Sequence, residues 1–161
     1  MHVLLVRHGE AVDVRAARID RDRWLTTSGR QTTTKVGEAL TRLDLRYSCI
    51  HTSPLVRAIQ TAEILAATQP GFEGPLEVSA ALSNEEGTTT EALAPLEQAQ
   101  KEDLIVLVTH MPKVAVLAGD LCRLTSAPSF RTASACLIEV QDGRGRFRWM
   151  LDPSTLELRP R

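Results

Sequence analysis

Long apolar runs, aromatic side chains and lysine are all scarce in this chain of 161 residues. No apolar stretch approaches the ~18 residues that a transmembrane helix needs, so no membrane span is expected. Two Trp, one Tyr and three Phe leave few surfaces on which single-stranded nucleic acid could stack. A formal net charge of -1 gives no overall attraction to nucleic acid or to acidic membranes. Neither is therefore expected as a partner.

Cysteine is also too rare for a disulfide framework. Cys49, Cys122 and Cys136 are an odd number at wide spacing, without a CxxC pair, which is typical of reduced thiols in a cytoplasmic protein. No HExxH or clustered His/Cys spacing indicates a metal site, and no cofactor is expected. The apolar run Val3 to Val6 ends at Arg7, which is too short for a signal peptide.

Arginine, in contrast, is abundant, because 16 of the 19 basic residues are Arg. The guanidinium group is a planar fork that suits phosphate and carboxylate. Genomic codon bias explains most of these residues equally well. An individual Arg therefore counts as a functional candidate only where its surroundings support that interpretation.

The apolar pattern predicts alternating strands and helices around a single core. Strands are expected at 2–6, 48–52, 76–78 and 104–109, and as a hairpin of 133–140 with 146–151 around Asp142-Gly143. Helices are expected at 27–43, with Thr27 or Ser28 as N-cap, at 55–67, at 90–100, and from Pro112 to about 124. Residues 10–24 are expected to form a long loop. This order predicts a three-layer α/β/α sandwich with a mostly parallel sheet and a C-terminal antiparallel hairpin, in one domain spanning 1–161.

Two histidines and two arginines follow the ends of predicted strands. Arg7 and His8 end the first strand, Arg57 comes shortly after the second, and His110 ends the strand at 104–109. Ligands of open α/β sheets bind beyond the carboxyl ends of the strands, so these four side chains are expected to converge there. His2 and His51 have no such neighbours and are interpreted as structural.

Such a group suits phosphoryl transfer. A neutral imidazole can attack phosphorus, and two Arg can hold the phosphoryl oxygens by charge-assisted hydrogen bonds. Positioning and charge stabilisation dominate this chemistry, so these residues could perform it without a metal. Gly9 would let the backbone approach the substrate closely. Other phosphatase chemistries have less support. No Cys is followed by Arg six residues later, so the loop of cysteine phosphatases is missing, and no GxxxxGK[ST] loop for nucleotide hydrolysis is present.

Four segments together resemble the histidine phosphatase superfamily, which is also called phosphoglycerate-mutase-like. Arg7-His8-Gly9-Glu10 resembles the RHG signature of that family, and residues 23–29 look like its R-x-L-T-x-x-G segment. Residues 53–62 are similar to its S-P-x-x-R-A-x-Q-T-A helix start, and residues 108–112 to its second-histidine motif. The resemblance covers nearly the whole chain, in order, and implies the phosphoglycerate-mutase-like fold.

The same resemblance implies a role for each matching residue. His8 would carry the phosphoryl group, Arg7 and Arg57 would clamp its oxygens, and His110 would stabilise charge during transfer. Arg23 matches a family Arg that contacts phosphate. Glu85 is the nearest candidate for the acidic residue that protonates the leaving group in many members, although the sequence around it does not match that motif.

The short length, the segment 130–135 and the ending at 147–153 most resemble the SixA group of bacterial phosphohistidine phosphatases. Only about 25 residues separate the strand at 76–78 from that at 104–109, too few for the cap that covers the site in many relatives. The implied partner is a phosphorylated histidine-containing protein of a phosphorelay. Two alternatives remain open at this point: a phosphatase of a small phosphate ester, and a non-catalytic phosphohistidine-binding protein. The sequence gives no indication of the oligomeric state.

Overall fold

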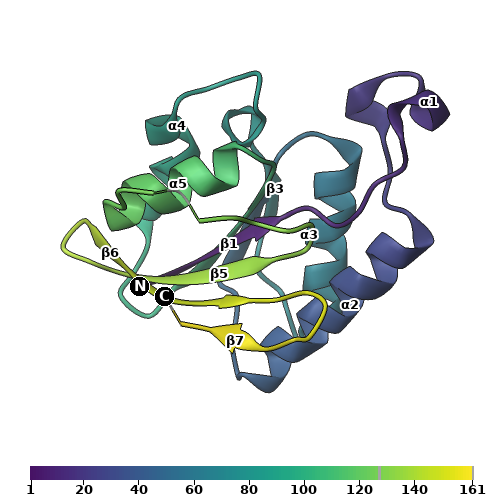
Figure 1. The fold of residues 1–161 in the computed structure, drawn as a ribbon. Coiled ribbons are helices and arrows are strands. Elements are labelled where there is room, and N and C mark those ends of the chain that lie inside the picture. The colour runs from purple at the N-terminus through teal and green to yellow at the C-terminus, as the bar shows by residue number, and fades with distance from the viewer. Residues whose placement is uncertain (127, 161) are drawn as a thin grey trace.

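The sheet at the centre of the molecule sets the position of every candidate residue. The computed structural model describes residues 1–126 and 128–160, and over these the strands form one seven-stranded sheet in the order β3-β2-β4-β1-β5-β6-β7 (Figure 1). The strands are β1 (His2–Arg7), β2 (Cys49–Thr52), β3 (Leu76–Val78), β4 (Leu104–Thr109), β5 (Ala135–Gln141), β6 (Arg144–Leu151) and β7 (Leu158–Arg159). The predicted α/β/α sandwich is confirmed.

The sheet is mixed. Strands β3, β2, β4 and β1 run parallel, whereas β5 pairs antiparallel with β1, β6 with β5, and β7 with β6. The predicted hairpin of β5 and β6 is confirmed, and it turns through Asp142 and Gly143, both at positive φ as a two-residue type I′ turn requires. Strand β7, which consists of two exposed residues, was not predicted.

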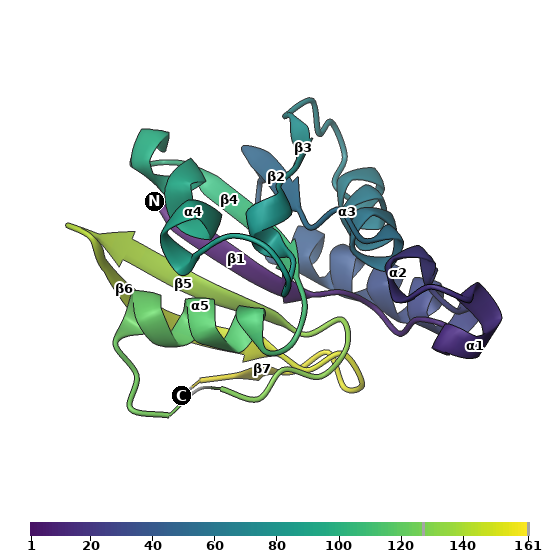
Figure 2. The ribbon, with the colours of Figure 1, turned by 90° about the horizontal axis from the view of Figure 1, so that it is seen from above.

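Helices cover both faces of the sheet. Helices α2 (Thr27–Arg42) and α3 (Val56–Thr68) lie on one face, and α5 (Lys113–Cys122), α4 (Thr89–Leu93) and the 3₁₀ turn η3 (Ala94–Gln98) lie on the other (Figures 1 and 2). Strand β1 contributes to the hydrophobic cores on both faces of the sheet. Leu4 and Val6 pack toward α2 and α3, while Val3 and Leu5 pack toward α5. This period of two is what a strand buried on both faces requires.

The strand register brings three chain segments to one edge. Arg7 of β1 pairs with Thr109 of β4, and Thr52 of β2 pairs with Val108 of β4. The next backbone amides continue the ladder, since His8 N–H donates to the Thr109 carbonyl and Ser53 N–H to the Val108 carbonyl, both at 3.0 Å. His8, Ser53 and His110 therefore leave the sheet side by side.

Several predicted boundaries were wrong in detail. The N-cap of α2 is Thr26, whose hydroxyl accepts from Gly29 N–H, rather than Thr27 or Ser28. The helix predicted at 90–100 divides into α4 and η3, because Pro95 lies in the first turn of η3 and has no N–H for an α-helical hydrogen bond. Pro112 is the N-cap of α5 and does not lie within its first turn.

The predicted loop at 10–24 is more ordered than expected. It contains α1 (Val14–Ala17) and the 3₁₀ turn η1 (Asp20–Asp22), and its two ends meet in a β-bridge between Ala11 and Leu25. Across the described residues, no helix is both long and apolar enough to cross a membrane.

Candidate active site

A cavity at the carboxyl edge of β1 and β4 brings together the residues that the sequence singled out. It is lined by Arg7, His8, Glu10, Ala11, Arg23, Arg57, Asn84, His110, Met111 and Thr132. Five of the seven candidate residues are in this set, and they come from four separate stretches of the chain. The predicted convergence is confirmed.

His8 directly follows β1 and is held in one tautomer. Its Nδ1 lies 2.7 Å from the Gly9 carbonyl oxygen, which can only accept, so Nδ1 carries the proton and Nε2 keeps its lone pair. Burial lowers the pKa of His8 to about 4, with a smaller contribution from Arg57 and Arg7, while the bond to Gly9 acts in the opposite direction. The ring is therefore a neutral base with a free nitrogen.

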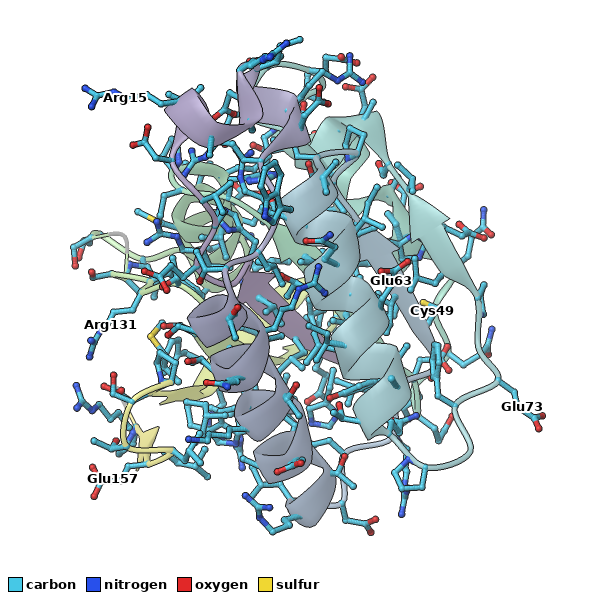
Figure 3. All side chains as sticks on the ribbon, turned by 90° about the vertical axis from the view of Figure 1, so that its right-hand side faces the viewer. Arg15, Cys49, Glu63, Glu73, Arg131 and Glu157 are labelled. Carbon is cyan, nitrogen blue, oxygen red and sulfur yellow. The ribbon has the colours of Figure 1, made fainter. Side chains whose placement is uncertain are left out.

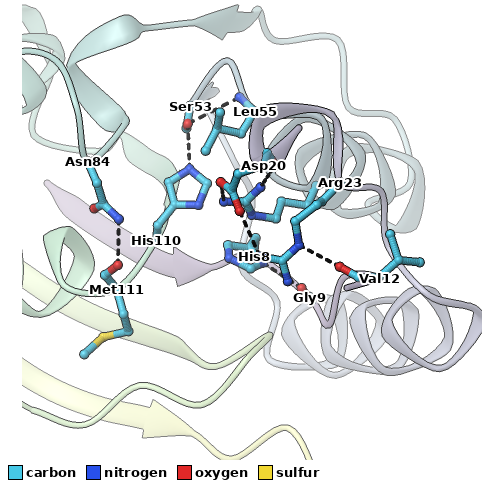
Figure 4. Close-up of polar contacts among 11 residues, drawn as sticks. His8, Gly9, Val12, Asp20, Arg23, Ser53, Leu55, Asn84, His110 and Met111 are labelled. Carbon is cyan, nitrogen blue, oxygen red and sulfur yellow. Dashed lines mark hydrogen bonds and ion pairs between the residues drawn. The ribbon is translucent and has the colours of Figure 1, made fainter. Parts of the chain in front are cut away.

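His110 lies beside His8 and is more deeply buried, with only 2% of its surface exposed. The ring centroids are 5.0 Å apart and the planes are tilted by 52°. His110 Nε2 lies 2.6 Å from the Ser53 hydroxyl (Figure 4). Burial lowers the pKa of His110 to about 3, and the cationic neighbours act in the same direction. At neutral pH both imidazoles are uncharged.

Arg7 and Arg57 are fixed by backbone carbonyls at the two sides of the cavity. Arg7 Nη1 donates to the Phe130 carbonyl at 2.7 Å, and Arg57 Nη1 donates to the Asp20 carbonyl at 2.6 Å. Arg57 lies in the first turn of α3, whose N-terminal N–H groups favour an anion. Both guanidinium groups therefore have a defined direction before any ligand binds.

Three nitrogens around this cavity are buried and have no hydrogen-bond partner among the described residues. They are Arg7 Nε, Arg57 Nε and His110 Nδ1. Buried polar atoms are nearly always satisfied, so such a group at one cavity calls for an explanation. The two guanidinium Nε–H groups can only donate, which matches the oxygens of an anion.

Asp20 bridges two arginines of the site and was missed by the sequence analysis. Its carboxylate lies 2.9 Å from Arg57 Nη2 and 3.0 Å from Arg23 Nη1. The hydrogen bond from Arg23, followed by that from Arg57, lowers the pKa of Asp20 despite partial burial. Figure 4 shows these contacts beside the two histidines. An acidic residue in a loop without periodicity gave no signal in the sequence.

Arg23 reaches the cavity as its resemblance to a phosphate-contacting Arg implied. Its Nε donates to the Val12 carbonyl at 2.6 Å, and its Nη1 contacts Asp20. The side chain is a quarter exposed, at 27%, so it forms part of the rim.

Gly9 and Glu85 do not line the cavity in the described part of the chain. A Cβ at Gly9 would lie 2.5 Å from Thr33 Oγ1 and 3.1 Å from the Gly29 carbonyl. Glycine is therefore needed there for packing against α2, whereas the sequence analysis attributed it to the approach of substrate. Glu85 is exposed, and its neighbour Asn84 lines the cavity instead. No contact supports Glu85 as an acid at this site.

The buried hydroxyl groups of Ser53 and Thr61 hold residues of the site in place. The Ser53 hydroxyl contacts His110, and the Thr61 hydroxyl accepts from Gly9 N–H at 3.0 Å while donating to the Arg57 carbonyl. Thr61 thus connects the His8 segment to α3. Both residues belong to the segment 53–62, but their roles depend on contacts across the sheet that sequence spacing does not reveal.

The cavity suits a small oxyanion. Three arginines line it, two neutral imidazoles lie between them, and the carboxylates nearby are Glu10 and Asp20. Among the described residues, no three His, Cys, Asp or Glu side chains are grouped closely enough to hold a metal ion. Chemically, the site offers a nucleophilic nitrogen surrounded by donors that could neutralise a phosphoryl group.

Comparisons with known proteins agree with this geometry. The family model of the histidine phosphatase superfamily (branch 1) matches residues 3–86. An uncharacterized protein of Picosynechococcus is 34% identical over 155 residues, covering 92% of this chain and 89% of that protein. Phosphohistidine phosphatase SixA of Escherichia coli is 27% identical over 172 residues, covering 98% of each chain. A structure of the protein histidine phosphatase SixA complexed with tungstate superposes with a TM-score of 0.87 at 27% identity, covering 98% of this chain and 100% of that one.

Proposed function

Because this chain belongs to the histidine phosphatase superfamily and is similar to SixA, we propose that it removes the phosphoryl group from a phosphohistidine of a phosphorelay protein, with His8 as the nucleophile. The chain is a phosphatase. The proposal concerns the substrate, the intermediate and the role of each residue. We also take residues 1–161 to be one catalytic domain.

The observation that carries the proposal is the state of His8. Its Nδ1 proton is committed to the Gly9 carbonyl, its pKa is about 4, and it lies beside three buried nitrogens that have no partner. A nucleophile must present a lone pair, and the phosphoryl oxygens must find donors. One cavity supplies both.

In the first step, His8 Nε2 attacks phosphorus in line with the nitrogen of the substrate's phosphohistidine. A P–N bond to His8 forms while the P–N bond of the substrate breaks, and the departing imidazole takes its proton from solvent or from its own ring. Arg7 and Arg57 hold the phosphoryl oxygens, and His110 contacts them from the other side. The phosphorylated His8 ring becomes cationic, and the Gly9 carbonyl stabilises that charge through Nδ1–H.

In the second step, water attacks phosphorus and the bond to His8 breaks. Inorganic phosphate leaves, the proton from water passes to solvent, and His8 returns to its neutral tautomer. Neither step requires a carboxylic acid at Glu85, because an imidazole leaves more readily than an alkoxide.

A protein substrate fits the shape of the site. Between β3 and β4 the chain forms only the 3₁₀ turn η2 (Ala80–Leu82), α4 and η3, so no large insertion covers the cavity. The rim residues Asn84 and Met111 are exposed. A histidine on the surface of a folded protein could therefore reach His8. Two of the relatives named above, both SixA proteins, are called phosphohistidine or protein histidine phosphatases, which favours the same substrate class.

The test is incubation with a histidine phosphotransfer domain that is phosphorylated on its histidine, followed by detection of acid-labile phosphate on this chain and of free phosphate. We expect both, and we expect a panel of small phosphate esters to be hydrolysed with a much lower kcat/KM. A higher kcat/KM for one of the esters would establish the alternative, a phosphatase of a small metabolite. Free phosphate without any labelled His8 would reject the proposed intermediate.

A further inference from the structure

Residues 12–24, here called the rim loop, form a loop at the edge of the cavity whose two ends lie together. The Ala11–Leu25 bridge and a 2.9 Å bond from Val12 N–H to the Trp24 carbonyl join its two ends. Figures 1 and 2 show α1 projecting from the body of the molecule. Compact surface loops whose ends meet in this way are frequently functional.

The inner side of the rim loop is anchored to the site. Asp20 accepts from Arg57, and Arg23 donates to the Val12 carbonyl within the loop itself. The loop therefore has a fixed position relative to the cavity, although α1 and η1 contain no buried residue. Its outer side is left available for contact with another molecule.

Three large apolar side chains of the rim loop are exposed: Val14 by 43%, Ile19 by 56% and Trp24 by 41%. Met111, which lines the cavity and is labelled in Figure 4, is 36% exposed. The described residues contain eight exposed large apolar side chains, and these four are half of them. Single exposed apolar residues are ordinary, but several within one loop that is anchored beside a cavity are typical of a contact surface.

The rim loop carries four arginines and three aspartates, a small excess of positive charge. Arg15, Arg18 and Arg21 are exposed and, like the exposed Asp22, make no ion pair with the described residues, while the Asp13 side chain accepts the Arg15 N–H as the N-cap of α1. Figure 3 shows Arg15 extending away from the protein. Unpaired guanidinium groups beside apolar side chains complement a surface that mixes apolar and acidic residues.

We propose that the outer side of the rim loop docks the protein that carries the phosphohistidine, through Val14, Ile19 and the arginines between and beside them. The inference rests on the proposed function and adds the source of its selectivity. The partner surface next to the phosphohistidine is apolar with acidic side chains. A small phosphate ester enters the cavity without touching this surface, so docking raises kcat/KM for the protein alone.

The test compares the double variant Val14→Ser/Ile19→Ser with the control Leu43→Ser. Leu43 is 41% exposed at the far end of α2, about 24 Å from the N-terminus of that helix. The substrates are a phosphorylated histidine phosphotransfer domain and p-nitrophenyl phosphate. We expect the double variant to lose about tenfold or more in kcat/KM on the domain. Its kcat/KM on the ester, and both values for the control, should stay within about twofold of wild type.

Each other outcome has a definite meaning. Equal losses on both substrates would show that the double variant damages the site, and an unchanged kcat/KM on the domain would show that the rim loop does not dock it; either result overturns the inference. Wild-type protein that hydrolyses the ester but not the domain would instead reject the proposed function. Concentration-dependent dimerisation in sedimentation velocity, lost in the double variant, would assign the surface to a second copy of this chain and also overturn the inference.

Discussion

His8 and His110 come from different strands, yet their ring centroids lie 5.0 Å apart, and both rings are neutral in the folded protein. Burial is the main reason that each pKa is low, and the surrounding arginines add to the effect. Two imidazolium groups at this distance would repel each other and the same three arginines. At neutral pH the pair therefore offers uncharged rings, as the proposed roles of His8 as nucleophile and His110 as hydrogen-bonding group require.

The first prediction follows from these pKa values. An ordinary histidine titrates near pH 6.5, so its ring C–H signals move between pH 8 and 5. The His8 and His110 signals should stay constant down to about pH 5 and move only as the pH falls toward 4. Their NMR titration, assigned with single His variants, measures this. A midpoint near 6.5 for His8 would contradict its proposed state.

The second prediction concerns Ser53, which lies 2.6 Å from His110 Nε2. Replacing Ser53 with Ala leaves that nitrogen without its partner, and a lost buried hydrogen bond costs about 1–3 kcal/mol. We expect kcat to fall by about ten- to a hundredfold, because His110 is no longer held in place. Tungstate, the oxyanion of the SixA complex, should still bind, since the two arginines of the clamp do not contact Ser53. An unchanged kcat would show that Ser53 does not position His110.

The third prediction concerns Asp20, whose carboxylate forms ion pairs with Arg57 and Arg23. A bound oxyanion would have to compete with this carboxylate for the two arginines. Asp20→Asn removes that negative charge while keeping a side chain of similar size. Because Asp20 is half exposed, solvent screens the interaction and the effect should be modest, about threefold tighter binding of tungstate. Isothermal titration calorimetry measures it. Weaker binding in the variant would show that Asp20 organises the arginines more than it competes for them.

The fourth prediction separates packing from chemistry at Gly9. A methyl group there meets Thr33, Gly29 and Leu25, so Gly9→Ala should lower the free energy of unfolding by about 1–3 kcal/mol. Gly119→Ala in α5 is the matched control, because a Cβ there has open space. That change should leave stability the same or raise it by up to about 1 kcal/mol. Urea unfolding of both variants decides the point, and equal effects would show that the close contacts at Gly9 relax without cost.

Much of the fold was predictable because its signals are local. The strand Leu104–Thr109 is apolar as far as Val108, as expected of an interior parallel strand, and Asp142-Gly143 suits the hairpin turn found there. The N-cap of α2 was not predictable, because Thr26, Thr27 and Ser28 are consecutive hydroxyl residues. The short β7 lacks any periodicity. Both features are decided by tertiary contacts.

The site was predictable to the extent that strand ends determine it. His8 and His110 each follow the last residue of a strand, so the topology alone brings them to one edge. Asp20 lies in the rim loop, whose path depends on the Ala11–Leu25 bridge and on contacts with Arg57. The sequence alone does not determine such a path. The choice of Asn84 over Glu85 as a lining residue also depends on how a loop packs and not on a local sequence pattern.

The central claim is that His8 carries the phosphoryl group. The most direct measurement is the amount of acid-labile, base-stable phosphate on the chain after brief incubation with a phosphorylated histidine phosphotransfer domain, in wild type, His8→Ala and the same-strand control His2→Ala. We predict labelling of wild type and His2→Ala, and neither labelling nor turnover for His8→Ala. Labelled His8→Ala protein, or turnover that survives this substitution, would contradict the account.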